Sequence, residues 1–262
     1  MRQRLRECFQ ELRSKRGKAL IPFITAGDPS LDISREIALG LVSRGADIIE
    51  LGFPFSDPVA DGPTIQKSYL RALEGGTTLP KVFDLAHSIR KETDVPLVLL
   101  TYYNPVYRTG IKEFVERALA AGLDGLVIPD LSFEESGPLR EEAGEELAVI
   151  SFVSPYTSRE RIKIISREAR GFLYCISAKG VTGARKEMTP EIPDIVSVIR
   201  EQTDLPLALG FGISTPGQVE EVAAFVEAII IGSALVEKVA TIKNREDVGN
   251  FLDVFSDFRE RC

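Results

Sequence analysis

The sequence predicts an α/β fold, a (β/α)8 (TIM) barrel with an extra N-terminal helix, in a single domain over residues 1–262. Apolar, β-branched runs alternate with amphipathic helical patterns, and eight such units fill the 262 residues, which is the count and size of this barrel. The runs are apolar throughout, as in parallel strands that are covered on both faces. A doubly wound open sheet is the alternative, but no GxGxxG motif follows the first strand, where a dinucleotide-binding fold has it.

The first predicted element is a helix with one apolar face, formed at spacings of i, i+3, i+4 and i+7 by Leu5, Cys8, Phe9 and Leu12. Eight apolar runs then predict strands at 19–26, 47–52, 96–103, 125–130, 148–155, 171–177, 206–213 and 227–233. Helices are predicted between them at 34–45, 81–93, 110–122, 140–146, 159–169, 194–203 and 216–225. No linker or low-complexity tract divides the chain.

Two connections are longer than a compact barrel needs. One runs from Phe53 to about Thr78 after the second strand, and the other from Ala178 to about Pro193 after the sixth. Long loops in a compact domain are often functional, and the loops that follow barrel strands carry the active site. We therefore expect both connections over the same mouth of the barrel, with the glycines of the second giving it the mobility of a lid.

Composition and charge exclude several classes of protein. The 39 Asp and Glu outnumber the 32 Lys and Arg, for a net charge of −7, whereas binders of nucleic acid or of anionic membranes need an excess of cations. No apolar run approaches the roughly 20 residues that span a bilayer, and the charged N-terminus lacks the apolar stretch of a signal peptide. Cys8, Cys175 and Cys262 are too few and too far apart for a disulfide framework. We expect a protein of the cytoplasm.

The single histidine restricts the chemistry further. His87 falls off the apolar stripe of its predicted helix, so we expect it to be solvated. A metal site built from several histidines is excluded, and a Ser-His-Asp triad is disfavoured. Proton transfer therefore has to come from carboxylates, Lys, Tyr or Cys.

Glu50 is the most anomalous residue, because it lies near the end of the otherwise apolar run 47–52. Burying a carboxylate is costly unless it is paired or protonated. A structural ion pair is the alternative to a catalytic role, but none of the eight strand cores contains a Lys or Arg. We therefore predict a carboxyl group with a raised pKa that exchanges protons near neutral pH.

Asp61 follows in the first long connection. It is either a functional carboxylate or a cap of a helix that begins near Thr64. Asp57 and Asp28 each precede a proline and have the same local alternative, and spacing alone does not separate Asp61 from Asp57.

Two small motifs, GFGIST (210–215) and IIIGSALV (229–236), place Gly and a hydroxyl residue where the seventh and eighth strands end. Backbone N–H groups at such junctions bind phosphate, and this position is a recurrent phosphate site in these barrels. Lys179 could form a Schiff base, but nothing apolar surrounds it to lower its pKa, so a solvated lysine is expected.

The run ELGFPFSDPVADGPTIQ (50–66) resembles a signature of the family of tryptophan synthase α subunits. PFITAGDP, KGVTGAR, GFGIS and GSALV follow in that family's order and spacing, so the resemblance spans nearly the whole chain. It implies a barrel that cleaves indole-3-glycerol phosphate to indole and glyceraldehyde 3-phosphate. By the same resemblance Glu50 is the proton-shuttling glutamate, Asp61 the carboxylate that faces the indole nitrogen, and Tyr174 an active-site tyrosine of lesser effect.

The resemblance also implies substrate-binding and partner-binding positions. The indole-pocket and phosphate positions are Phe23, Leu100, Val127, Thr182, Gly183, Phe211, Gly212, Gly232 and Ser233, with Thr182 closing toward Asp61 as part of the lid. Pro54, Asp57 and Asn104 lie on loops that meet a β subunit in an α2β2 complex. That subunit carries pyridoxal phosphate and receives the indole, whereas the α subunit holds no cofactor.

This reaction is compatible with the residues available. Retro-aldol cleavage needs an electron sink, and an indole protonated at C3 provides one without a metal ion or an imine. Two carboxylates then suffice, one to move protons and one to stabilise positive charge. Three alternatives remain open: a lyase that releases free indole by itself, another phosphosugar barrel enzyme such as a Schiff-base aldolase at Lys179, and a non-enzymatic barrel that activates a partner.

Overall fold

The computed structural model describes residues 3–176, 192–210 and 212–262. Its strands all pair in parallel, in the order β5-β4-β3-β2-β1-β9-β8-β7-β6. They are β1 (Ala19–Thr25), β2 (Ile49–Gly52), β3 (Leu97–Leu100), β4 (Gly125–Val127), β5 (Ala148–Val149), β6 (Ser151–Val153), β7 (Leu173–Ile176), β8 (Leu207–Gly210) and β9 (Ala228–Ile231).

The nine strand segments form a nearly closed barrel because one predicted strand is divided. The run 148–155 forms β5 and β6, separated by Ile150 alone, and β5 pairs with β4 whereas β6 pairs with β7. The two ends of the strand order are therefore consecutive in the chain. This arrangement confirms the predicted (β/α)8 barrel, with the fifth predicted strand shared between two neighbours.

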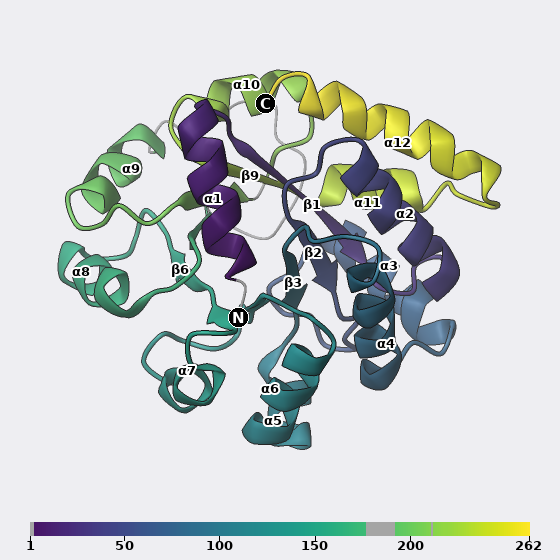
Figure 1. Cartoon of the computed structure of the whole chain (residues 1–262), viewed down its shortest axis with the longest axis horizontal. Helices are drawn as coiled ribbons and strands as arrows, with labels where there is room; N and C mark the ends of the chain where they lie inside the picture. Colours follow the sequence, from purple (N-terminus) through teal and green to yellow (C-terminus); the bar gives the residue numbers. More distant parts are fainter. Residues whose placement is uncertain (1–2, 177–191, 211) are drawn as a thin grey trace.

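Helices surround this barrel (Figure 1). They are α1 (Arg4–Lys15), α2 (Leu31–Ser43), α3 (Pro63–Glu74), α4 (Leu79–Arg90), α5 (Tyr103–Thr109), α6 (Ile111–Ala120), α7 (Gly137–Ala143), α8 (Arg159–Glu168), α9 (Ile192–Arg200), α10 (Pro216–Ala223), α11 (Ser233–Val239) and α12 (Glu246–Arg259). Three of them, α5, α11 and α12, are additional to those that the sequence patterns predict, and α3 begins next to Thr64, where the capping alternative for Asp61 places a helix. None of the helices in the described ranges has the length and apolarity that a membrane span requires.

The core has two layers, and strand β1 shows why. Leu20 and Ile24 pack outward against the helices, whereas Ile21 and Phe23 point into the barrel. Both faces of the strand are buried, because successive side chains of a strand point to opposite sides. This explains why the strands read as continuous apolar runs.

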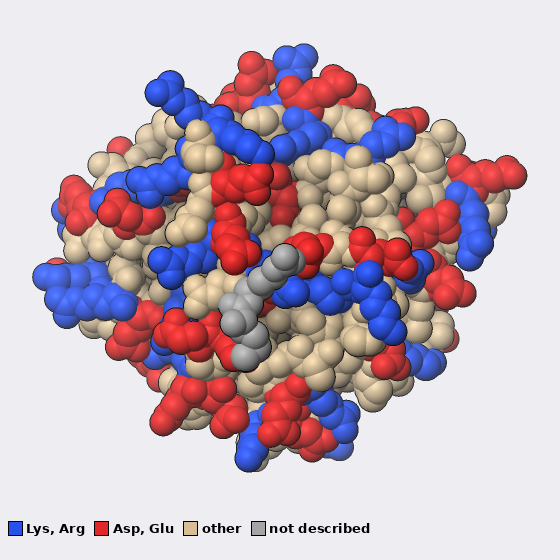
Figure 2. All heavy atoms as spheres, viewed as in Figure 1, with Lys and Arg blue, Asp and Glu red and all other residues tan. Residues whose placement is uncertain are grey.

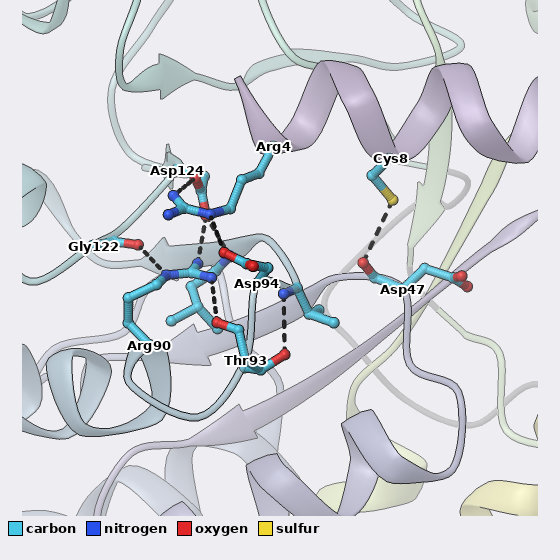
Figure 3. Close-up of polar contacts among 10 residues, drawn as sticks. Arg4, Cys8, Asp47, Arg90, Thr93, Asp94, Gly122 and Asp124 are labelled. Atoms are coloured by element: carbon cyan, nitrogen blue, oxygen red, sulfur yellow. Dashed lines mark hydrogen bonds and ion pairs between the residues drawn. The ribbon is translucent and has the colours of Figure 1, made fainter. Parts of the chain in front are cut away.

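Helix α1 covers the amino-terminal end of the barrel (Figure 1). Leu5 and Phe9 are buried in the inner core, where the ring of Phe9 lies 6.0 Å from that of Phe172. Figure 3 shows how the helix is held: Asp124 accepts from Arg4 at 3.0 Å and from Arg90 at 2.7 Å. The predicted extra helix is thus confirmed, and it leaves the opposite end of the barrel for a site.

Charges on the face that α1 covers are mixed rather than of one sign (Figure 2). Ion pairs account for several of them, such as Arg259 with Asp47 at 2.8 Å and Arg170 with Glu145 at 2.8 Å. Acidic and basic side chains are therefore interspersed on this face and partly paired with one another.

The first long connection contains α3, which occupies about half of it. Asp28 is buried against this helix and accepts two hydrogen bonds from Arg71, at 2.8 Å to Nε and 2.7 Å to Nη2. Asp28 does lie in a turn, where its backbone N–H donates to the carbonyl of Thr25 at 3.2 Å, but its carboxylate pairs with Arg71, which is 43 positions away on another element. The second long connection, with Lys179, Thr182 and Gly183, lies outside the described residues.

Candidate active site

A cavity of about 480 Å³ opens at the carboxyl ends of the strands. Residues at the ends of β2, β3, β7 and β9 and in the connections after them line it, so it lies at the barrel end opposite α1. The predicted site residues that line it are Phe23, Glu50, Asp61, Leu100, Tyr174, Gly212, Gly232 and Ser233. The structure therefore brings together residues that are up to 210 positions apart in the chain.

Glu50 points into the barrel because of the alternation in β2. Its neighbours Ile49 and Leu51 belong to the outer core, whereas Glu50 faces the cavity and is only 2% exposed. Its Oε1 atom has no hydrogen-bond partner, and no ion pair links it to a Lys or Arg within the described ranges. Burial, and secondarily the negative charge of Asp61, raise the pKa of Glu50 to about 8.

Asp61 is the second buried carboxyl of the cavity. The hydroxyl of Tyr102 donates a hydrogen bond to its Oδ2 atom at 2.6 Å. Burial raises the pKa of Asp61 to about 6, although the hydrogen bond from Tyr102 opposes this effect. The capping alternative for Asp61 is wrong, since α3 begins at Pro63 after Gly62 and has no side-chain cap.

Asp57 differs from Asp61 in its surroundings. It is exposed, and its Oδ2 atom accepts a hydrogen bond from the neighbouring Ser56 at 2.5 Å. The fold thus separates the two aspartates that spacing could not, because only Asp61 turns into the cavity.

Tyr102 is a functional candidate that the sequence interpretation missed. Its hydroxyl accepts a hydrogen bond from the backbone N–H of Ala60 at 3.1 Å while donating to Asp61, and its ring stacks on Phe55 at 5.2 Å. Burial first, and the charge of Asp61 second, raise the pKa of Tyr102, which keeps the hydroxyl protonated as a donor. In the sequence, Tyr102 looks like a core residue at the end of a strand. Only the fold shows that its hydroxyl contacts Asp61.

Tyr174 lines the cavity from β7. Its ring lies 5.0 Å from that of Phe152 and also packs against Gly210, where a side chain would collide with it. Burial, followed by the charges of Glu50 and Asp61, raises its pKa well above the ordinary value. Its phenol is therefore neutral beside the two carboxyl groups.

The remaining substrate positions fall into two groups. Val127 is buried in the same inner core as Phe23 and Leu100 but is not among the residues that line the cavity. Phe211, like Thr182 and Gly183, lies outside the described residues.

The end of the cavity near β8 and β9 carries the predicted phosphate positions. Gly212 has a φ of 84°, a backbone conformation that favours glycine, and α11 begins at Ser233 directly after Gly232. Lys238 on α11 is the one Lys or Arg among the described residues that line the cavity. Glu237 lines the cavity beside it, so these two side chains carry opposite charges. Phe23 and Leu100 contribute apolar surface to the cavity, and Phe23 also lies next to Gly232.

The predicted partner positions lie in the connections after β2 and β3, at the carboxyl-terminal end of the barrel. Asp57 and Asn104 are exposed, whereas Pro54 is buried within the chain itself. Two large apolar side chains on the same segments, Val59 and Tyr107, are 75% and 71% exposed. His87 is exposed on α4, as predicted.

Comparison with known proteins gives one consistent result. A family model described as tryptophan synthase alpha chain matches residues 9–259. The tryptophan synthase alpha chain of Thermoanaerobacter sp. (strain X514) is 45% identical over 94% of both chains, and that of Geobacillus stearothermophilus is 50% identical over 86% of this chain and 84% of the relative.

Solved structures agree. Tryptophan synthase subunit alpha from Legionella pneumophila str. Paris superposes with a TM-score of 0.88 at 32% identity, covering 100% of this chain and 98% of the other. A structure of the tryptophan synthase α2β2 complex from Pyrococcus furiosus gives 0.86 at 36% identity, covering 92% and 98%. The chain therefore belongs to the tryptophan synthase alpha chain family.

Proposed function

We propose that Glu50 and Asp61 carry out the lyase reaction of this family in tryptophan biosynthesis, the cleavage of indole-3-glycerol phosphate to indole and glyceraldehyde 3-phosphate. The observation that carries the proposal is a pair of buried carboxyl groups in one cavity, of which Glu50 has an Oε1 atom without a hydrogen-bond partner and Asp61 accepts a hydrogen bond from Tyr102. Burial raises the pKa of Glu50 to about 8 and that of Asp61 to about 6. Near pH 7 the first is protonated and the second is ionised, so one acts as an acid and the other as an anion.

Glu50 moves the protons of the reaction. It donates a proton to C3 of the indole ring, which makes the ring a cationic electron sink. The bond between C3 and the side chain then breaks, its electron pair returns to the ring, and the side-chain hydroxyl becomes the aldehyde. Glu50 accepts the proton that this hydroxyl loses, so its protonation state is restored at the end of the turnover.

Asp61 stabilises the positive charge that develops on the ring. An ionised carboxylate in a site shielded from water stabilises such a charge more strongly than it would in solution. Tyr102 supports this role because its hydrogen bond to Asp61 favours the ionised form.

The shape and lining of the cavity support the substrate assignment. Its volume of about 480 Å³ lies in the range of small-molecule sites. Phe23 and Leu100 provide an apolar surface for the indole ring. Gly212, Gly232 and Ser233 provide backbone N–H groups for the phosphate, with Lys238 nearby.

We further propose that the chain works with a β subunit and needs no cofactor of its own, pyridoxal phosphate being held by that partner. The Pyrococcus furiosus relative is an α2β2 complex. Asp57, Asn104 and the exposed apolar residues Val59 and Tyr107 lie at the carboxyl-terminal end of the barrel, where a partner could receive indole. Pro54 is buried and would act by shaping the loop.

An indole-release assay on Glu50→Gln and Asp61→Asn, with and without a β subunit, tests the proposal. Both variants should lose at least 100-fold in single-turnover rate. Loss of a general acid–base group such as Glu50 costs about 10²–10⁴, and loss of an electrostatic stabiliser such as Asp61 costs about 10²–10³. Asp57→Asn is the matched control for Asp61→Asn and should retain cleavage by the isolated chain. Unchanged indole release by Glu50→Gln would exclude the proposed mechanism, and borohydride trapping at Lys179 would favour the Schiff-base alternative.

A further inference from the structure

Tyr69 is a buried polar residue that the proposed reaction does not use. It lies on α3, is 1% exposed, and its hydroxyl has no hydrogen-bond partner. The adjacent Ser68 shows that buried polar groups of this helix are otherwise satisfied, since its Oγ atom lies 2.6 Å from that of Thr25. A buried hydroxyl without a partner is uncommon and calls for a specific explanation.

The Tyr69 hydroxyl reaches the inner face of β2. A Cβ atom on Gly52 would lie 3.3 Å from it. Glu50 and Gly52 are two positions apart in a strand and therefore point to the same side. The phenol consequently lies against the same strip of the barrel wall as Glu50.

The Oε1 atom of Glu50 is the second unsatisfied atom of this site. Of the four buried side-chain atoms without a hydrogen-bond partner in the described part of the chain, two are thus found here, one on Glu50 and one on Tyr69. A protonated phenol can donate and a carboxylate can only accept. The two groups are therefore complementary.

Other titratable groups around the pair have different roles. Asp61 faces both Glu50 and Tyr69, and Tyr102 and Tyr174 also face Tyr69. Tyr102 already donates to Asp61 and accepts from the backbone. Of the other described residues that line the cavity, the exposed Glu237 and Lys238 are charged. Burial first, and the charge of Asp61 second, raise the pKa of Tyr69, so its phenol stays protonated and remains a donor.

We propose that Tyr69 is a positioning residue for Glu50, whose hydroxyl donates a hydrogen bond to the Glu50 carboxylate once that carboxyl has given up its proton. A rotation of the Glu50 side chain, or one bridging water molecule, forms the bond. In the protonated state Glu50 faces the substrate; in the ionised state the buried negative charge gains a donor. Tyr69 does not line the cavity, so it acts through Glu50 and not on the substrate.

Tyr69→Phe removes only the hydroxyl, and Tyr156→Phe on the exposed surface is the matched control. The ionisation of Glu50 can be followed by the infrared C=O band of its protonated carboxyl, assigned with Glu50→Gln. In Tyr69→Phe the midpoint of this titration should rise by about one pH unit, because a hydrogen bond to a charged group is lost. The control should keep the midpoint of the original chain.

Kinetics provides a second readout that rests on the proposed function. The maximal single-turnover rate of Tyr69→Phe at pH 7 should fall by up to about tenfold, the equivalent of one pKa unit, because the carboxylate that forms when Glu50 gives up its proton loses its donor. The substrate concentration that gives half-maximal rate should not change, because Tyr69 does not line the cavity. The unfolding temperature should be retained or raised, since the deleted hydroxyl makes no hydrogen bond.

The two readouts fail separately. An infrared midpoint that Tyr69→Phe leaves unchanged would overturn the inference even if Glu50→Gln abolishes cleavage. A shifted midpoint together with full activity of Glu50→Gln would leave the Tyr69–Glu50 pair standing and remove the proposed function instead.

Discussion

The hydrogen bond from Tyr102 to Asp61 offers a quantitative test of the two-carboxyl mechanism. The active form has Glu50 protonated and Asp61 ionised, so activity should be highest between the pKa values of about 6 and about 8. Tyr102→Phe deletes the donor to Asp61. A hydrogen bond to a charged group contributes about 1.5–3 kcal/mol, so its loss raises the pKa of Asp61 by about one unit or more.

The expected loss of rate depends on pH. For a shift of one unit from about 6, the ionised fraction of Asp61 falls about fivefold at pH 6, about twofold at pH 7 and little at pH 8. Single-turnover indole release measured from pH 5 to 9 should therefore show an acid limb displaced upward and an alkaline limb, set by Glu50, that stays in place. The optimum becomes narrower and moves toward higher pH.

A stability measurement accompanies this profile. Tyr102→Phe also leaves the N–H of Ala60 without its acceptor, which should lower the free energy of unfolding by about 1–3 kcal/mol. Tyr156→Phe serves as the control, because that side chain is exposed. An acid limb that does not move in Tyr102→Phe would refute the assignment of Asp61 as the group that must be ionised.

Three further outcomes concern stability. Glu50 binds a proton more tightly in the folded chain than in the unfolded chain, because folding raises its pKa from 4.5 to about 8. Its contribution to the free energy of unfolding is therefore largest below pH 4.5 and declines as the pH rises to about 8. Glu50→Gln should raise the unfolding temperature, by a margin that grows over this pH range. Arg71→Met leaves the buried Asp28 carboxylate unpaired and should cost about 3–5 kcal/mol in urea unfolding, and a cost below 1 kcal/mol would contradict the pairing. Arg4→Met removes one of the two cations on Asp124 and should speed amide hydrogen exchange in α1 while leaving indole release unchanged.

Local patterns predict the barrel and its most unusual residue. Glu50 stands out because an apolar strand without a nearby cation contains it. The division of the run 148–155 into two strands is not predictable in this way, since it depends on which neighbours the strand pairs with. Hydrogen-bond register is a property of the closed sheet and leaves no local signal.

The other site residues require tertiary information for a similar reason. Asp61 and Asp57 occupy equivalent turn-like contexts in the sequence, and only the burial of one under Tyr102 distinguishes them. Tyr102 and Tyr69 each look like ordinary core aromatics, because a hydroxyl's partner, or its lack of one, is visible only after folding. The resemblance to a family identifies Asp61 as a site residue, whereas the structure gives the physical reason, its burial in the cavity beside Tyr102.

Gly52 constrains how this barrel wall can diverge. A methyl group there would lie 2.5 Å from the ring of Phe23 and 3.3 Å from the oxygen of Tyr69. Alanine at this position becomes tolerable only after the opposing ring has been trimmed, so a relative with a larger residue here should carry a compensating smaller one at position 23. Substitutions at positions 52 and 23 are therefore expected to occur together in relatives. A laboratory library that randomises the two positions one at a time will miss the viable combinations.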